Sequence, residues 1–161
     1  MRVAGIINNS VVNGIGVRDV IFFQGCPHHC HGCHNPHTWG YDGGYTISIE
    51  NLCDKFKNSS NDITLSGGEP ILQYSELLVF MKYVNRKQHK RFWIYTGFKY
   101  EEIPPNMLAE LSEYVDVLVD GKFEEDKKDL KLQFRGSSNQ RLINLPESVK
   151  KNKIVIWEEC E

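Results

Sequence analysis

Apolar stretches rich in β-branched and aromatic residues recur along the chain, and they predict a series of short strands. The first, residues 17–23 (VRDVIFF), leads directly to Gly25 and a loop that contains three cysteines. Further strands are predicted at residues 63–66, 92–95 and 115–119, and a last short one at residues 154–157.

Helical periodicity fills the intervals between these strands. Apolar positions at i, i+3, i+4 and i+7 predict two amphipathic helices, the second beginning near Ser75 as its N-cap. Pro104 and Pro105 mark the start of a third helix. The three apolar faces consist of Ile49, Leu52, Cys53 and Phe56, then of Leu77, Phe80, Met81 and Val84, and finally of Leu108 and Leu111.

This alternation of strand, loop and helix predicts an α/β fold with a parallel sheet and with candidate sites at the carboxyl ends of the strands. The 161 residues fit a single domain over residues 1–161. They fall well short of the roughly 250 residues of a complete eight-unit barrel. We therefore expect a partial, open (β/α) barrel of mostly parallel strands.

Composition and charge exclude several classes of protein. With 40% hydrophobic and 25% charged residues the chain is ordinarily globular. A net charge of -2 and a pI near 6.3 give no basic footprint for nucleic acid. No apolar stretch approaches the roughly 18 residues of a membrane span, and residues 1–7 are too short for a signal peptide. We expect a cytoplasmic protein without a membrane partner.

The candidate chemistry begins with Cys26, Cys30 and Cys33, because three thiolates are one too few for a closed tetrahedral metal site. Either another residue completes the site or the metal keeps an open position. One alternative is a structural zinc whose fourth ligand is a nearby histidine. Another is an iron-sulfur electron-transfer module that recruits Cys53 or Cys160. However, Cys53 lies on an apolar helix face and Cys160 is penultimate, so we expect a buried thiol and a free thiol in a mobile end.

A second constellation, Leu-Ser-Gly-Gly-Glu-Pro at residues 65–70, follows the next predicted strand. Gly67 and Gly68 lack side chains, so their backbone can approach a ligand closely, and their carbonyl groups can accept hydrogen bonds from an ammonium group. A plain tight turn before a helix opened by Pro70 explains the same residues.

Together the Cys-x3-Cys-x2-Cys loop and the Gly-Gly-Glu turn resemble the radical S-adenosylmethionine (SAM) superfamily. The resemblance extends over nearly the whole chain to one family, the activating proteins of anaerobic ribonucleoside-triphosphate reductase. The residues that carry it are Asn13, Gly14, Gly16 and Arg18, Asn35, Thr38 and Trp39, WIYTGF at residues 93–98, VDVLVDGKF at residues 115–123 and FRGSSNQR at residues 134–141. Gly32 follows the family, whereas His34 stands where a tyrosine is expected.

The resemblance implies an enzyme, a glycyl radical enzyme activating oxidoreductase with a partial barrel of the radical SAM type. It implies one 4Fe-4S cluster per chain, held by Cys26, Cys30 and Cys33, with SAM on the fourth iron. Reductive cleavage of SAM would then give a 5′-deoxyadenosyl radical. The implied SAM-binding residues are Gly32, Cys33 and His34 at the adenine, Gly67, Gly68 and Glu69 at the methionine moiety, Asp120 at the ribose hydroxyls and Lys122 at the methionine carboxylate. Glu69 has a second role open to it, bracing the turn.

The implied protein partner is the large subunit of the reductase, which would lose a hydrogen atom from a glycine. Residues 136–141 are expected either to dock that subunit or to form an ordinary exposed loop. Flavodoxin or ferredoxin is the implied electron donor. Activation of another glycyl radical enzyme, such as pyruvate formate-lyase, is an alternative. Trp39 is expected to shield the cluster or to lie in the core, and His28, His29, His31 and His37 are expected to lie on the loop surface without a catalytic part.

Overall fold

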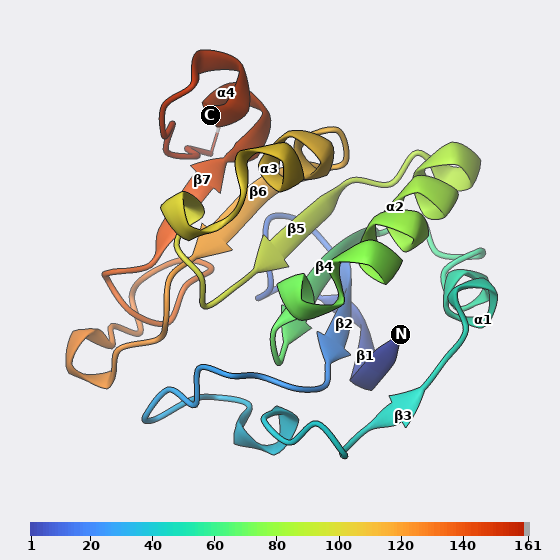
Figure 1. Ribbon diagram of the computed structural model, residues 1–161, viewed down its shortest axis with the longest axis horizontal. Helices are drawn as coiled ribbons and strands as arrows, with labels where there is room; N and C mark the ends of the chain where they lie inside the picture. Colours follow the sequence, from blue (N-terminus) through green and yellow to red (C-terminus); the bar gives the residue numbers. More distant parts are fainter. Residues whose placement is uncertain (160–161) are drawn as a thin grey trace.

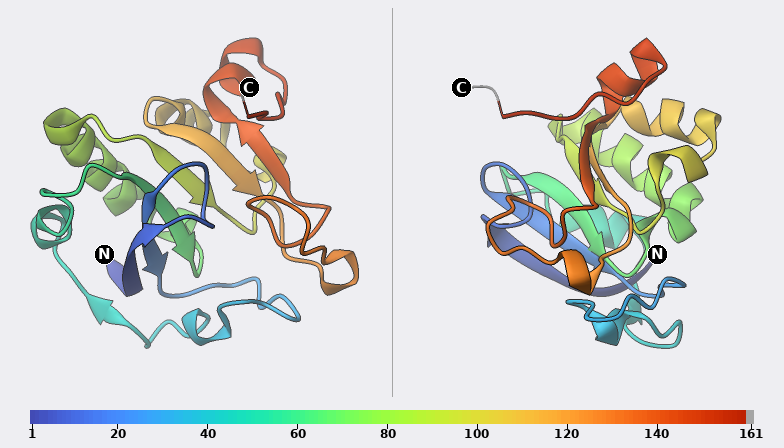
Figure 2. Two further views of the ribbon diagram at one scale, coloured as in Figure 1. Left: turned by 180° about the vertical axis from the view of Figure 1, so that it is seen from behind. Right: turned by 90° about the vertical axis from the view of Figure 1, so that its left-hand side faces the viewer.

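The computed structural model describes residues 1–159 and contains a seven-stranded sheet with helices on one of its faces (Figures 1 and 2). The order of the strands in the sheet is β3-β1-β2-β4-β5-β6-β7. The strands are β1 (Arg2–Ser10), β2 (Arg18–Phe23), β3 (Tyr45–Thr46), β4 (Asp62–Gly67), β5 (Phe92–Tyr95), β6 (Val115–Asp120) and β7 (Arg141–Asn144).

The four central strands, β2, β4, β5 and β6, are parallel to one another, which confirms the strands predicted there. Phe23 lies opposite Gly67, and Tyr95 lies opposite Val119. The loops that follow these four strands therefore leave the sheet at one common edge. The cysteine loop and the glycine turn are thereby brought side by side.

The outer strands correct the expectation of a mostly parallel sheet, because β1, β3 and β7 all pair antiparallel. The sheet is mixed and not closed. The pattern did not reveal β1, because among its nine residues only Val3 is buried and clear alternation is missing. The predicted strand at residues 154–157 is wrong: this segment makes one isolated bridge, between Ile143 and Ile156.

Four helices fill the connections: α1 (Ile49–Asp54), α2 (Tyr74–Gln88), α3 (Pro105–Ser112) and α4 (Leu145–Lys151). Helix α2 begins one residue before Ser75, which is therefore not its N-cap. Figure 2 shows α2 and α3 on one side of the sheet and the segment between β6 and β7 on the other. Among the described residues, no helix has both the length and the apolar character needed to cross a membrane.

Strand alternation divides the apolar residues between the two faces of the sheet. Phe92 and Ile94 of β5 belong to the main core under the helices, which also holds Cys53, 3% exposed as expected. Trp93, between them in sequence, belongs to a smaller cluster with Val117, Val119 and Leu142 on the opposite face. The rings of Phe134 and Trp157 cover this second cluster.

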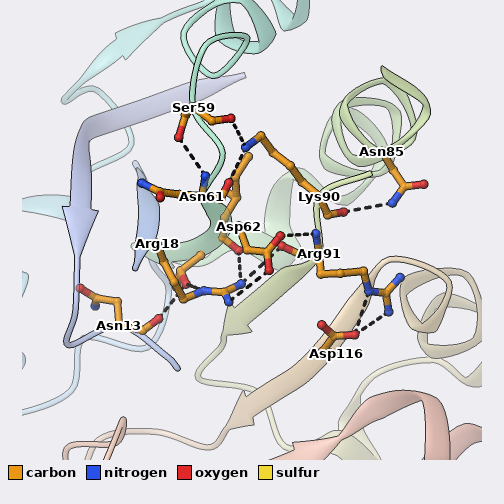
Figure 3. A network of polar contacts seen from close by, with 11 residues as sticks. Asn13, Arg18, Ser59, Asn61, Asp62, Asn85, Lys90, Arg91 and Asp116 are labelled. Carbon is orange, nitrogen blue, oxygen red and sulfur yellow. Dashed lines mark hydrogen bonds and ion pairs between the residues drawn. The ribbon is translucent and has the colours of Figure 1, made fainter. Parts of the chain in front are cut away.

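A polar network lies at the amino ends of the parallel strands (Figure 3). Its centre is Arg18, which is 3% exposed, donates to Thr64 Oγ1 at 2.8 Å and lies over the ring of Trp93. The Nζ atom of Lys90 donates to the carbonyl of Ser59 at 2.8 Å. These internal bonds satisfy the buried cations at this edge, and the predicted chemistry lies at the other edge.

Candidate metal and cofactor site

One cavity opens at the carboxyl edge of the parallel strands, and it brings together most of the residues that the sequence singled out. Of the predicted site residues, the cavity wall contains Cys26, Cys30, Cys33, His34, Gly67, Gly68 and Lys122. Gly32, Glu69 and Asp120 are not part of this wall. The parallel topology thus brings Lys122 to the same cavity as the cysteines, although they lie far apart in the sequence.

The cysteine loop is anchored by backbone hydrogen bonds on both sides of Cys26. Gly25 donates its N–H to the carbonyl of Thr38 at 2.8 Å, and Cys26 donates to the carbonyl of Trp39 at 3.1 Å. Cys26 is buried, whereas Cys30 and Cys33 are partly exposed. All three are free thiols. The loop therefore presents one inner and two outer sulfur atoms to the cavity.

Burial raises the pKa of the Cys26 thiol, and the backbone N–H groups of His28 and His29 near its sulfur act in the opposite direction. Burial also raises the pKa of Cys30. A thiol must lose its proton to bind a metal, so metal uptake at these positions releases protons.

The donor set fits an iron-sulfur cluster, because thiolates are the usual ligands of such clusters and each thiolate holds a different iron. A single ion such as zinc needs its ligands around one point. Among residues 1–159, no three His, Cys, Asp or Glu side chains are grouped in that way. Cys53 lies in the core, and Cys160, the other proposed distant ligand, lies outside the described residues.

The glycine turn is held against the cysteine loop by two backbone hydrogen bonds. Gly68 donates to the carbonyl of Phe23 at 2.9 Å, and Glu69 donates to that of Gly25 at 2.8 Å. A Cβ atom on Gly68 would lie 2.4 Å from the oxygen of Gly25. Gly67 adopts a φ of +92°, which favours glycine. Contact between the two loops therefore requires glycine at both positions, in addition to any contact with a ligand.

Glu69 is fully buried, and contacts within the protein engage its carboxylate. Oε1 accepts hydrogen bonds from Ile71 N at 3.1 Å and Thr96 Oγ1 at 2.8 Å. Oε2 accepts from Gly97 N at 2.8 Å and lies 2.8 Å from His28 Nε2. This arrangement favours the bracing role over a contact with an ammonium group.

The side chain of His28 corrects the expectation that this histidine lies on the loop surface. It is 7% exposed, contacts Glu69 and is part of the cavity wall. His28 and Glu69 are 41 positions apart in the sequence. Loops have no periodicity from which a contact between two such residues could be predicted. By contrast, His29, His31 and His37 are exposed as expected.

Two other predicted residues lie beside the cavity. The carboxylate of Asp120, 1% exposed, accepts hydrogen bonds from Tyr100 N at 2.7 Å and from Arg141 Nε at 3.0 Å. Gly32 has a φ of +73°, and a Cβ there would lie 2.9 Å from a carboxylate carbon of Glu125. The roles predicted for both toward SAM stay predictions.

The outer wall combines aromatic rings with the polar loop at residues 134–141. The ring of His34 lies 4.9 Å from that of Phe123, and Trp39 stacks on His29 at 4.9 Å. Gln140 Oε1 accepts from the N–H groups of Gly136 and Ser137, and its Nε2 donates to the carbonyl of Gly121 at 3.0 Å.

Several further cavity residues, namely Phe22, Ser66, Tyr95 and Phe123, have no role that the sequence pattern predicts, and the pattern does not distinguish Gln140 within its loop. Strand alternation could have placed Tyr95 on the same face of the sheet as Trp93. The position of Gln140 depends on a loop conformation that no local pattern announces.

Comparisons with known proteins agree with this chemistry. A family model described as "4Fe-4S single cluster domain" matches residues 12–143. The chain is similar to curated proteins named anaerobic ribonucleoside-triphosphate reductase-activating protein. One from Pasteurella multocida (strain Pm70) is 37% identical over 142 residues, which cover 81% of this chain and 89% of the relative. One from Enterobacteria phage T4 is 36% identical over 150 residues (88% and 92%), and one from Escherichia coli (strain K12) is 38% identical over 148 residues (84% and 93%).

Proposed function

Because this chain belongs to the family of anaerobic ribonucleoside-triphosphate reductase-activating proteins, an enzyme family with a 4Fe-4S domain, we propose that it activates the large subunit of such a reductase. The observation that carries the proposal is the meeting of Cys26, Cys30 and Cys33 with the glycine pair in one cavity. An open sheet with its site at the carboxyl edge also suits a partial barrel of the radical SAM type.

The proposal requires a 4Fe-4S cluster and SAM. Cys26, Cys30 and Cys33 would hold the cluster, which would supply one electron for the cleavage of SAM into methionine and a 5′-deoxyadenosyl radical. This radical would take a hydrogen atom from a glycine of the large subunit, so that a glycyl radical and 5′-deoxyadenosine would remain. The chain itself would bind and orient the cluster and SAM, and it would exclude water from the cavity.

Several of the predicted site residues then have proposed tasks. The three thiolates hold three irons, and the side of the cavity toward Gly67 and Gly68 receives the methionine moiety. Lys122 also borders the cavity, and its ammonium group would bind the methionine carboxylate. His34 and the backbone around Cys33 would contact the adenine. Glu69 braces the turn, because its carboxylate is engaged by the contacts described above.

Residues 136–141 are proposed to guide the glycine-bearing loop of the large subunit into the cavity. Gly136 and Gln140 belong to the cavity wall, so this segment stands where a partner would approach SAM. Flavodoxin or ferredoxin is the proposed source of the electron.

The test is to mix the anaerobically reconstituted protein with the large subunit, SAM and a reductant, and to record electron paramagnetic resonance spectra. A glycyl doublet together with 5′-deoxyadenosine is expected, and both are lost when Cys26, Cys30 or Cys33 is changed to alanine. Cleavage of SAM without a doublet would point to another glycyl radical enzyme, and pyruvate formate-lyase is then tested in the same assay. A colourless protein that takes up zinc and no iron would contradict the proposal.

A further inference from the structure

We propose that His28 is a positioning residue. Its imidazole binds the buried carboxylate of Glu69, connects the cysteine loop to the glycine turn, and thereby holds Cys26 in position beside that turn. The inference rests on the proposed function, because it concerns the same cavity. It adds a residue outside the three cysteines and the Gly-Gly-Glu turn.

The first observation is the convergence of three loops on one carboxylate. His28 comes from the loop after β2, Glu69 from the turn after β4, and Thr96 and Gly97 from the end of β5. Their donor atoms all lie 2.8 Å from the oxygens of Glu69, and Ile71 N adds a fourth contact at 3.1 Å. A buried carboxylate needs such donors because water does not reach it. Without His28, one of the four would be missing.

The second observation is that the surroundings are shaped to admit the imidazole. Its ring meets the ring of Phe98 edge to face, with centroids 4.6 Å apart. A Cβ on Gly97 would lie only 2.3 Å from Cδ2 of His28. Glycine at position 97 is therefore required for the histidine to lie over this strand end. The Thr-Gly-Phe sequence at residues 96–98 thus forms the surface against which the His28 ring packs.

The third observation links this side chain to the metal ligand. The backbone N–H groups of His28 and His29 lie near the sulfur of Cys26 and act to lower the pKa of its thiol, and His28 itself is only two residues beyond this ligand. Hydrogen bonds to cluster sulfurs are one of the means by which a protein sets the reduction potential. Fixing the imidazole against Glu69 also fixes the backbone from which this N–H points. His28 thus acts on Cys26 through its main chain and on the glycine turn through its side chain.

The test compares His28→Ala and His28→Gln with the wild type, and uses His37→Ala as a matched control. His37 belongs to the same loop region, but its side chain is exposed. The proteins are reconstituted with iron and sulfide. The rate of iron loss to a chelator and the reduction potential of the cluster are measured without SAM, and the KM for SAM and the kcat of its cleavage are measured separately.

We expect His28→Ala to lose iron about tenfold faster than the wild type, in line with the effect of removing residues that orient metal ligands. Its potential should be more negative, since a backbone N–H that is held less firmly near the Cys26 sulfur stabilises the reduced cluster less. In His28→Gln the amide nitrogen reaches about as far as Nε2, so iron loss should stay within about threefold of the wild type. His37→Ala should match the wild type.

The outcomes separate this inference from the proposed function. Wild-type protein that takes up no cluster overturns both. Wild-type protein that binds the cluster and cleaves SAM, while His28→Ala matches His37→Ala in iron loss and potential, overturns the role of His28 alone. If His28→Ala does not fold, Glu69→Gln decides: a shifted potential supports the contact, and an unchanged potential overturns it.

Discussion

The carboxylate of Asp120 is paired with the guanidinium group of Arg141, whose Nε donates to Oδ1 at 3.0 Å. Arg141 also donates to both carboxylate oxygens of Glu101, at 3.0 and 2.8 Å. These contacts join the end of β6 to β7 and to the loop after β5. Lys122, only two residues beyond Asp120, is exposed and borders the cavity.

This geometry predicts different effects at the two positions. Asp120→Asn removes a buried partner of Arg141 and should cost about 2 kcal/mol of unfolding free energy, with the KM for SAM changed less than about threefold. Lys122→Met keeps the length of the side chain and removes its charge, so it should raise the KM for SAM about tenfold with little loss of stability. Denaturant unfolding and SAM-cleavage kinetics give both quantities. A large rise in KM in Asp120→Asn, with stability unchanged, would instead support its predicted ribose contact.

The ion pair between Arg141 and Glu101 predicts a pH dependence of stability. The hydrogen bond from Arg141 lowers the pKa of Glu101 from 4.5 to about 2. Because the folded-state pKa is depressed, the contribution is complete above about pH 4.5 and is lost as the pH falls through about 2. Glu101 is largely exposed, so solvent screening keeps the contribution to about 0.5 kcal/mol.

Urea unfolding between pH 6 and pH 2.5 checks this, in roughly half-unit steps. Glu101→Gln should lose less stability over that range than the wild type. Glu50→Gln is a suitable control, because Glu50 is exposed on α1 and forms no ion pair with the described residues. Parallel curves for the wild type and Glu101→Gln would contradict the prediction.

The close contact at Gly68 predicts that even one methyl group is harmful. In Gly68→Ala the new Cβ would lie 2.4 Å from a backbone oxygen, where no side chain can move aside. The cost should be about 1–3 kcal/mol from overpacking, together with a reduced iron content after reconstitution. At Gly40 a Cβ meets nothing within 4 Å, so Gly40→Ala serves as the matched control. Equal stability and iron content in the two variants would show that the loops separate easily.

The network at the opposite edge predicts a contrast between two arginines (Figure 3). Arg18 is 3% exposed, and its Nη2 donates to the carbonyl of Ile63 at 2.9 Å. Arg18→Ala should cost about 3 kcal/mol, because it leaves buried acceptors without a donor. Arg91 pairs with Asp116 at the surface, so Arg91→Ala should cost about 1 kcal/mol or less. Thermal and urea unfolding compare them, and a smaller loss in Arg18→Ala than in Arg91→Ala would contradict this account.

The central part of the fold could be predicted because parallel strands buried on both faces leave continuous apolar runs in the sequence. Residues 92–95 (FWIY) give such a run, and β5 covers Phe92–Tyr95. The cavity followed from topology, since loops after neighbouring parallel strands meet at one edge. Spacing alone also placed Cys26, Cys30 and Cys33 on a single loop, and that loop does border the cavity.

The remaining features depend on contacts between residues far apart in the sequence. Strand β1 is half exposed and pairs antiparallel, so its pattern resembled a short apolar run. The partners of Glu69 and Asp120 belong to other loops, and a charged residue at the end of a strand does not reveal whether a ligand or an arginine will meet it. For these two carboxylates, the sequence therefore does not distinguish pairing within the protein from binding of a ligand.

Gln140 shows how such pairing shapes the entrance of the cavity. Its Oε1 accepts hydrogen bonds from Gly136 N at 2.9 Å and Ser137 N at 3.2 Å, and its Nε2 donates to the carbonyl of Gly121. One amide side chain thus holds the loop at residues 134–141 in shape and joins it to the end of β6. Because a carboxylate cannot donate, Gln140→Glu loses the bond to Gly121 and keeps the two acceptor contacts.

We therefore expect Gln140→Glu to loosen the loop from the sheet while the cysteine loop stays intact. The rate of 5′-deoxyadenosine formation without the large subunit should stay within about threefold of the wild type, whereas the yield of glycyl radical per SAM cleaved should fall about tenfold. Ser138→Ala is the control within the same loop, since the Ser138 side chain forms no hydrogen bond with the described residues. An unchanged ratio of radical to 5′-deoxyadenosine in Gln140→Glu would show that the large subunit reaches the cavity without this loop. A fall in both quantities together would place Gln140 in SAM binding, because a defect in docking alone leaves cleavage without the partner unaffected.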